Sequence, residues 1–252
     1  MADSLVKKRA ASVADLKEMT DARVALGRFG AGTPTRAAQA FLLDHARARE
    51  AVWSTVDHAR LRRGLEGLPI AVIDVESQAE DRSSYVRRPD LGRKLSPAST
   101  EKLLASANGF DVVVVIADGL SSSAVDINAA PLVRSLVERL MALGLSVGPV
   151  VIASQARVAL ADPVGEALDA RVAIMLIGER PGLSAADSLG AYLTHTPRAG
   201  TPDSRRNCVS NIREGGLSVE AAAETIVGLV TDMMRAGISG VGLKEAVGRL
   251  AP

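Results

Sequence analysis

Residues 111–130, DVVVVIADGLSSSAVDINAA, decide the predicted fold. Five apolar residues at 112–116 follow one another without alternating polar positions, which is typical of a parallel strand covered by helices on both faces. A polar turn with Asp118, Gly119 and three serines comes next, and a helical pattern begins at Ala124. Because ligands of open α/β sheets collect outside the carboxyl ends of the strands, this turn is predicted to border a binding crevice.

The composition restricts the class of protein. With 252 residues of which 47% are apolar, the chain can bury a sizeable core, which argues against disorder. A formal net charge of +1 and 2% aromatic residues argue against nucleic-acid binding. No apolar run approaches the roughly 20 residues of a membrane span, and the start lacks the apolar core of a signal peptide, so a cytoplasmic protein is expected. Cys208 is the single cysteine, which excludes an intrachain disulfide and a multi-cysteine zinc site, and no metal site is predicted.

An alternation of strands and helices predicts an α/β fold with a mostly parallel sheet. Besides the central strand, strands are expected at residues 69–75, 148–153 and 171–177, and helices at 97–107, 124–143, 163–168 and 219–235. Right-handed crossovers would bring the four carboxyl ends to one rim. A further apolar segment at 189–193 could extend the sheet.

The first 66 residues are predicted to form a helical N-terminal arm. Helical patterns cover residues 12–28 and 34–57, and the composition changes at the first strand, so we divide the chain into residues 1–66 and 67–252. The glycines between the two helices lack the Lys and Ser/Thr of a phosphate loop, which favours a connector over a nucleotide loop. The arm could present a solvated basic face or clasp a partner subunit.

Two polar segments have the composition of possible sites. Residues 80–97, EDRSSYVRRPDLGRKLSP, are predicted to be a long surface loop whose Arg87, Arg88 and Arg93 could bind phosphate or an acidic partner, or could be ordinary solvated charge. The GLSSS sequence lacks the final glycine of a nucleophile elbow, and the three histidines lie in unrelated contexts, so a hydrolase is not supported.

The most specific motif is IGERPG, residues 177–182. Consecutive Glu179, Arg180 and Pro181 at a strand end are costly without a partner, and the flanking Gly178 and Gly182 would permit close approach of another molecule, although a charged surface turn is the alternative. Later in the chain, Cys208 lies in a turn-rich segment, residues 204–216. Two preceding arginines could lower the pKa of its thiol, or the cysteine could be a small packing residue.

The whole set of motifs resembles the small (light) subunit of ethanolamine ammonia-lyase over nearly the entire chain. The segments that carry the resemblance are LKEMTDARVALGRFGAGTPT, RPDLGR, VVVVIADGLSS, ASQARVALADPVGE, IGERPGLSAADSLGAYLT and RNCVSNIREGG. This resemblance implies a lyase that uses adenosylcobalamin to convert ethanolamine to acetaldehyde and ammonia. It also implies a hetero-oligomer of several pairs, each with a catalytic TIM-barrel large subunit and a small subunit whose Rossmann-like domain follows a helical N-terminal part.

Three positions match the family's cobalamin contacts: Val158 in QARVAL, Glu179 in IGERPG and Cys208 in RNCVSN. The resemblance implies that these residues hold the cofactor at the interface with the large subunit, and that the large subunit carries the chemistry, so no residue of this chain is predicted to be catalytic. None of the three histidines fits the Asp-x-His-x-x-Gly motif that replaces the lower cobalt ligand. The cofactor is therefore expected to keep its own dimethylbenzimidazole.

Two questions stay open at the level of sequence. Some family members carry a longer N-terminal extension associated with bacterial microcompartments, and the short segment before the first predicted helix leaves enclosure of this protein undecided. The rival hypothesis is a stand-alone Rossmann-like module that binds a nucleotide or another small molecule, and its support is the DGLSSS turn at the end of the central strand.

Overall fold

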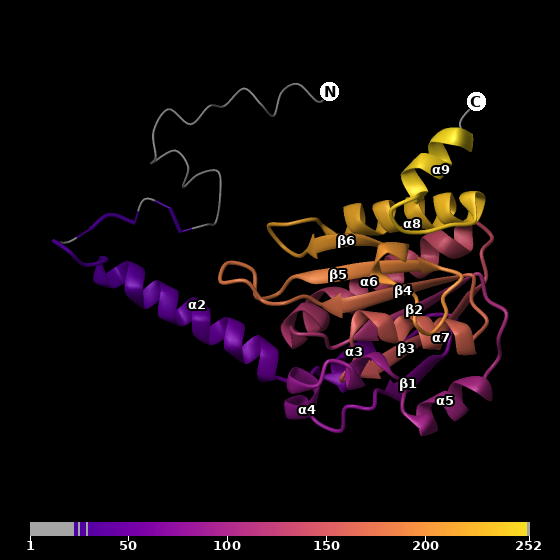
Figure 1. The fold of residues 1–252 in the computed structure, drawn as a ribbon, viewed down its shortest axis with the longest axis horizontal. Coiled ribbons are helices and arrows are strands. Elements are labelled where there is room, and N and C mark those ends of the chain that lie inside the picture. Colours follow the sequence, from indigo (N-terminus) through magenta and orange to yellow (C-terminus); the bar gives the residue numbers. More distant parts are fainter. Residues whose placement is uncertain (1–22, 25, 29, 251–252) are drawn as a thin grey trace.

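One six-stranded sheet organises the chain, with strand order β1-β3-β2-β4-β5-β6 (Figure 1). The computed structural model describes residues 23–24, 26–28 and 30–250. The strands are β1 (Val72–Glu76), β2 (Val112–Ala117), β3 (Val147–Ser154), β4 (Val172–Gly178), β5 (Leu189–His195) and β6 (Arg206–Ile212). The pairs among β1 to β4 are parallel, whereas β5 and β6 join antiparallel, so the predicted α/β fold with a mostly parallel sheet is confirmed. Its Rossmann-like character stays a prediction.

The central strand is β2, which pairs with β3 on one side and β4 on the other. All six of its residues are buried. Alternate side chains enter two different cores, with Val114 in one and Val113 in the other. A strand that is buried on both faces has no polar positions, which is why its sequence shows no alternation.

Helices cover both faces of the sheet. The helices of the described chain are α2 (Thr35–Trp53), α3 (His58–Leu65), α4 (Arg82–Arg87), α5 (Pro97–Leu104), α6 (Ser122–Ala142), α7 (Ala161–Ala167), α8 (Val219–Ala236) and α9 (Leu243–Leu250). Side chains of α3, α6 and α8 fill one core, and those of α5 and α7 contribute to the other. Helices α5 to α8 confirm the sequence prediction to within a few residues, whereas α3 and α9 were not predicted. Within the described part of the chain, no helix combines the length and apolar character needed to cross a membrane.

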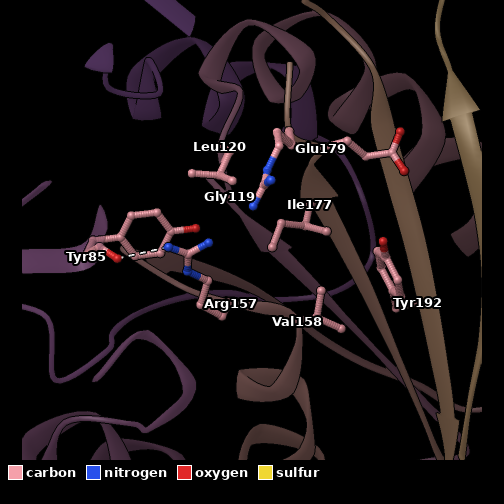
Figure 2. A pocket seen from close by; sticks show the side chains of 10 residues that line it. Tyr85, Gly119, Leu120, Arg157, Val158, Ile177, Glu179 and Tyr192 are labelled. Atoms are coloured by element: carbon pink, nitrogen blue, oxygen red, sulfur yellow. Dashed lines mark hydrogen bonds between the residues drawn. The ribbon is translucent and has the colours of Figure 1, made fainter. Parts of the chain in front are cut away.

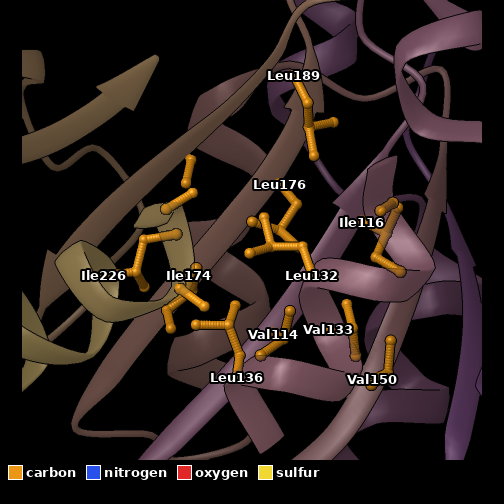
Figure 3. Packing of buried hydrophobic residues seen from close by; sticks show 14 of the residues in the cluster. Val114, Ile116, Leu132, Val133, Leu136, Val150, Ile174, Leu176, Leu189 and Ile226 are labelled. Atoms are coloured by element: carbon orange, nitrogen blue, oxygen red, sulfur yellow. The ribbon is translucent and has the colours of Figure 1, made fainter. Parts of the chain in front are cut away.

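The larger core lies between α6 and the sheet (Figure 3). Leu132 and Leu136 of α6 are fully buried and pack against the strand residues Val114, Ile174 and Leu176. Burying a leucine side chain contributes roughly 1.5–3 kcal/mol. This contact fixes α6, and therefore the turn that precedes it, relative to the carboxyl ends of the strands.

The connections create a crevice at the rim of the sheet. The chain passes from β1 to β2 through α5 on one face, returns from β2 to β3 through α6 on the opposite face, and reaches β4 through α7 on the first face. The loops after the neighbouring strands β2 and β3 therefore leave toward opposite faces. Such a reversal is the place where open α/β sheets bind ligands.

Helix α2 extends away from the layered part of the molecule (Figure 1). Ala51 is its only buried residue. The helix predicted at residues 34–57 is present but shorter, while the helix predicted at 12–28 lies mostly outside the described residues, and the described residues among them are not helical. Because Leu61 and Leu65 of α3 lie in the larger core, α3 packs with the sheet. The division into residues 1–66 and 67–252 stays a prediction.

Two segments differ from the prediction. Residues 80–97 are not simply a surface loop, because they contain α4 and a short 3-10 helix (Leu91–Arg93), and Tyr85 is fully buried. The buried apolar side chains of this segment, Tyr85 and Leu95, lie ten residues apart and therefore show no helical or strand periodicity. The segment around Cys208 is not merely turn-rich, because β6 runs through it. As β6 lies at the edge of the sheet, most of its residues stay at least partly exposed, and its sequence reads as polar.

Candidate functional site

Two adjoining pockets lie at the carboxyl ends of the parallel strands, each with a volume of about 430 Å³. The first, called here the rim pocket, is lined by Tyr85, Gly119, Leu120, Arg157, Val158, Ile177, Gly178, Glu179, Arg180 and Tyr192. The second, called the edge pocket, is lined by Pro89, Arg93, Arg157, Val158, Ala159, Tyr192, Asp203, Arg206 and Cys208. Arg157, Val158 and Tyr192 belong to both, so the pockets form one continuous recess.

All three residues predicted to contact a cofactor line this recess. Val158 lies where the two pockets meet, Glu179 lines the rim pocket and Cys208 lines the edge pocket. They come from the segments after β3 and β4 and from β6. Tyr192 on β5 was missed by the sequence analysis, although it pairs directly with Cys208 in the antiparallel register. Because β6 was not predicted as a strand, this pairing gave no signal in the sequence.

The wall between the loops after β2 and β4 is made of backbone. A Cβ atom at Gly178 would lie 2.1 Å from the carbonyl oxygen of Ser121, and one at Gly119, which has φ 55°, would lie 2.2 Å from the carbonyl oxygen of Gly178. The Leu120 N–H donates to the same Gly178 oxygen at 2.9 Å. Gly178 thus permits close approach of this chain's own backbone, and its predicted contact with another molecule stays a prediction. Gly182 has no neighbour nearer than 3.9 Å.

The serines after β2 serve the fold. The Ser121 hydroxyl caps α6 by accepting from the Ala124 N–H at 3.2 Å, and it donates to the carbonyl oxygen of Ala186 at 2.5 Å. Ser121 and Ser122 are buried, and Ser123 makes a longer bond of 3.4 Å to the same Ala186 oxygen. No serine of this turn lines the rim pocket or the edge pocket, although Ser122 and Ser123 line a separate pocket beside α2. A binding role of this turn stays a prediction.

Asp118 also has an internal role. Its Oδ1 accepts from the N–H groups of Gly119 at 3.1 Å and Ala156 at 3.0 Å, and its Oδ2 accepts from Arg82 at 2.9 Å. Burial raises the pKa of this carboxyl, whereas the Ala156 N–H and Arg82 lower it. The carboxylate ties the end of β2 to the loop after β3, because Gly119 and Ala156 belong to these two segments.

Opposite chemical groups face each other across the rim pocket (Figure 2). Arg157 lies beside Tyr85 on one side, and Glu179 and Tyr192 lie on the other. Between them, Val158 and Ile177 present apolar side chains, and Leu120 adds a third. The recess could therefore hold a ligand with an apolar face, hydrogen-bond donors on one edge and a negative group on the other.

Glu179 is held from two sides. Its Oε2 accepts from the Ser188 hydroxyl at 2.5 Å and from the Asn211 N–H at 3.3 Å. Asn211 has φ 59°, beside an irregularity in the pairing of β5 and β6 that directs this N–H toward the carboxylate. Gly190 leaves room for the side chain, because a Cβ there would lie 2.9 Å from Oε1. No described residue donates a hydrogen bond to Oε1, which leaves this atom for a ligand.

Cys208 is not an activated thiol. Partial desolvation raises the pKa of the exposed Cys208, and a hydrogen bond with the Tyr192 hydroxyl acts in the opposite direction. The preceding arginines were predicted to lower the pKa of the thiol. Arg206 does not act in this way, because its buried guanidinium binds Asp162 and Asp203. The thiol and the Tyr192 hydroxyl therefore offer neutral hydrogen-bonding groups. The pKa of Tyr192 is likewise raised, mainly by burial.

Of the three arginines predicted in the segment 80–97, only Arg93 lines the recess. Arg88 pairs with Asp90 at the surface, while Arg93 does line the edge pocket. None of His45, His58 and His195 lines either pocket. Among the described residues, no group of three or more His, Cys, Asp or Glu side chains is arranged to hold a metal ion.

Known proteins resemble this chain over almost its full length. The family model described as ethanolamine ammonia-lyase light chain (EutC) matches residues 10–244. The ethanolamine ammonia-lyase small subunit of Rhodopseudomonas palustris is 50% identical over 235 residues, which cover 93% of this chain and 90% of that protein. The small subunit of Bradyrhizobium diazoefficiens is 49% identical over 254 residues, covering 100% and 97%, and that of Azotobacter vinelandii is 47% identical over 239 residues, covering 91% and 87%. The match to the family model and these identities show that the chain belongs to the family of ethanolamine ammonia-lyase small (light) subunits.

Proposed function

We propose that this chain forms a complex with a large catalytic subunit, that the complex converts ethanolamine to acetaldehyde and ammonia with adenosylcobalamin, and that the recess is this chain's share of the cofactor site. The observation that carries the proposal is the convergence of Val158, Glu179 and Cys208, from three separate segments, on one recess around Tyr192. Family membership supplies the reaction and the partner. A cytoplasmic location, with or without a microcompartment, belongs to the same proposal.

The side chains of the recess fit a corrinoid. Cobalamin is a broad disc fringed with amides, so Glu179 Oε1 and the Tyr192 hydroxyl could bind amide groups while Val158, Ile177 and Leu120 contact the apolar ring. Pockets of roughly 300–1,000 Å³ suit drug-sized ligands. A cobalamin is larger, so it would span both pockets and extend toward the partner subunit.

The residues of this chain bind and position the cofactor. When bound, adenosylcobalamin supplies the radical chemistry of the lyase reaction. Glu179 is held by Ser188 and Asn211, so the fold itself positions this carboxylate. Because all three histidines lie away from the recess, the cofactor would keep its own dimethylbenzimidazole as the lower ligand.

Helix α2 is the proposed contact with the large subunit. It belongs to the proposed N-terminal arm, residues 1–66, which precedes the proposed Rossmann-like domain. Three neighbouring apolar residues on α2 are exposed, namely Phe41, Leu42 and Leu43, and Trp53 at its end is exposed as well. A helix with so few buried residues gains little from this chain's own core, since most helical stability in proteins comes from packing. Several such pairs of large and small subunits would form the hetero-oligomer.

The experiment compares cofactor affinity in the assembled complex. We expect Glu179→Ala to weaken binding of hydroxocobalamin, followed by its absorption spectrum, by more than Cys208→Ser does. A desolvated hydrogen bond to a charged group contributes roughly 1.5–3 kcal/mol, whereas serine preserves the size and hydrogen-bonding capacity of cysteine.

Ser188→Ala is the matched control for Glu179→Ala. It removes the 2.5 Å bond to Glu179 but leaves the carboxylate in place. A loss of affinity as large as that of Glu179→Ala would mean that the carboxylate supports the loop rather than the cofactor. Failure of the wild-type complex to bind any corrinoid would refute the proposed function itself.

A further inference from the structure

Arg157 occupies the junction of the two pockets and is held rigidly by its own chain. The backbone turns just before it, because Gln155 has φ 53°. The Arg157 N–H donates to the Gly92 carbonyl oxygen at 2.7 Å, and a Cβ at Gly92 would lie 2.9 Å from the Arg157 Cγ, so only glycine leaves room for the arginine stem. The guanidinium carbon lies 4.1 Å from the centre of the Tyr85 ring, and Nη2 donates to the Tyr85 carbonyl oxygen at 3.0 Å (Figure 2).

Arg157 differs from two nearby arginines in the way its charge is balanced. Arg82 binds Asp118 at 2.9 Å, and Arg206 binds Asp162 and Asp203. Among the residues that the structure describes, no carboxylate forms an ion pair with Arg157. The fold therefore neutralises two of its arginines, whereas Arg157, like Arg180 of the same pocket, faces the recess without a carboxylate partner among the described residues.

One donor of Arg157 lacks a partner as well. Its Nε is buried and forms no hydrogen bond with the described residues. A buried donor left without an acceptor costs about 1–3 kcal/mol, and more when the group is charged. Arg82 Nη2 and Arg206 Nε are likewise buried without a partner, so the missing carboxylate is what separates Arg157 from these two arginines. An arginine fork without a carboxylate beside a pocket suits an anion, especially one with two oxygens.

The other groups that line the rim pocket indicate which group of the cofactor Arg157 would bind. Glu179 and Tyr192 face Arg157 across the apolar side chains of Val158 and Ile177. Carboxylate and hydroxyl groups suit the amide fringe of a corrin. The only negatively charged group on the periphery of a cobalamin is the phosphodiester of its nucleotide tail, which matches the cationic side of the recess.

We propose that Arg157 binds the phosphodiester of the cofactor's nucleotide tail. This inference rests on the proposed function and deepens it, because it assigns one residue of this chain to one group of the cofactor. The tail carries the dimethylbenzimidazole, so fixing its phosphate also fixes the register of the corrin on the rim. Arg157 acts in binding and orientation, and no step of the reaction is assigned to it.

Two truncated corrinoids test the assignment. Cobinamide lacks phosphate, ribose and base, whereas cobinamide phosphate retains the phosphate alone. Dissociation constants of both are measured by absorption titration on the complex of small and large subunits, with wild-type protein and with Arg157→Gln. We expect the wild type to prefer cobinamide phosphate by about 10- to 100-fold, the range given by one charge-assisted contact, and Arg157→Gln to reduce this preference to less than about threefold.

Two further variants separate a local contact from general effects. Arg93→Gln removes an equal charge from the edge pocket, where Arg93 is exposed, and should leave the preference for phosphate unchanged. Arg157→Lys keeps the charge but loses the planar fork, and should retain part of the preference.

The outcomes are distinct. Unchanged cobinamide affinity in Arg157→Gln, together with the lost phosphate preference, supports the assignment and shows that the variant is folded. Three results overturn it: a preserved preference in Arg157→Gln, an equal loss in Arg93→Gln, or a loss of affinity for both corrinoids, which would make Arg157 a support of the pocket wall. If the wild-type complex binds neither corrinoid, the proposed function fails instead.

Discussion

Replacing Gly178 by alanine should damage both the stability and the ligand site of this protein. The added Cβ would lie 2.1 Å from the carbonyl oxygen of Ser121 and 2.7 Å from that of Asp118. Both neighbours are backbone atoms, so no flexible side chain can move aside. To reach ordinary van der Waals contact, the loops after β2 and β4 would have to separate by more than about 1 Å.

The size of the effect follows from two losses. Overpacking of a tight site typically costs 1–3 kcal/mol, and separation of the loops would strain or break the 2.9 Å bond from the Leu120 N–H to Gly178, which adds about 1 kcal/mol. We therefore expect a destabilisation of about 2–4 kcal/mol. For a chain of 252 residues this corresponds to a fall in Tm of roughly 4–16 °C.

Gly182→Ala is the control, because it adds the same methyl group to the same loop. Its nearest neighbours are 3.9 and 4.0 Å away, and we expect a change within about 0.5 kcal/mol. Thermal unfolding followed by circular dichroism measures both variants, and corrinoid titration of the assembled complex measures the recess. Equal Tm values and equal affinities for Gly178→Ala and Gly182→Ala would refute the argument that backbone contact shapes this rim.

Two further predictions concern the arm and the start of β2. Deletion of residues 1–57 should leave the sheet domain cooperatively folded by circular dichroism but abolish its association with the large subunit in a pull-down assay, and undiminished association would exclude the clasp. Hydrogen bonds from the backbone and hydroxyl of Ser146, together with Arg171, hold the pKa of Asp111 below its usual 3.8. The ionised carboxylate therefore stabilises the fold above pH 3.8, and this stabilisation is lost as the pH falls through the lower pKa of the folded state. Asp111→Asn should therefore lower the free energy of unfolding, measured by urea titration near pH 7, by less than about 1 kcal/mol, because solvent screens the pair with Arg171. A difference that persists at the lowest pH would contradict the charge argument.

The parallel part of the fold was predictable because its strands are buried on both faces of the sheet. β2 is apolar at every position because it has a core on each face, and β3 and β4 share this property almost throughout. Once these strands and the helices between them are known, right-handed crossovers bring their ends to one rim. The general location of the site therefore follows from the sequence.

The edge of the sheet could not be predicted in the same way. β6 buries few of its residues, so its pattern does not differ from that of a polar turn. α4 has six residues, too few for a helical period, and is fixed by the single buried Tyr85, whose hydroxyl donates to the Ala156 carbonyl oxygen at 3.1 Å. Such long-range contacts leave no local signal. For this reason the parts of the recess formed by Tyr85 and Tyr192 escaped the sequence analysis.

Hydrogen-bond partners separate the polar residues that build the rim from those that are left for a ligand. The serines after β2 and Asp118 looked like binding groups in sequence, but cap α6, hold the loop after β4 or join the ends of β2 and β3. Glu179, which lies in the most specific motif, and Arg157 each retain an atom that no described residue binds, and both residues line one recess. A sequence motif can place a polar group at a strand end. Only the count of its bonds within the fold shows whether it is still free to bind another molecule.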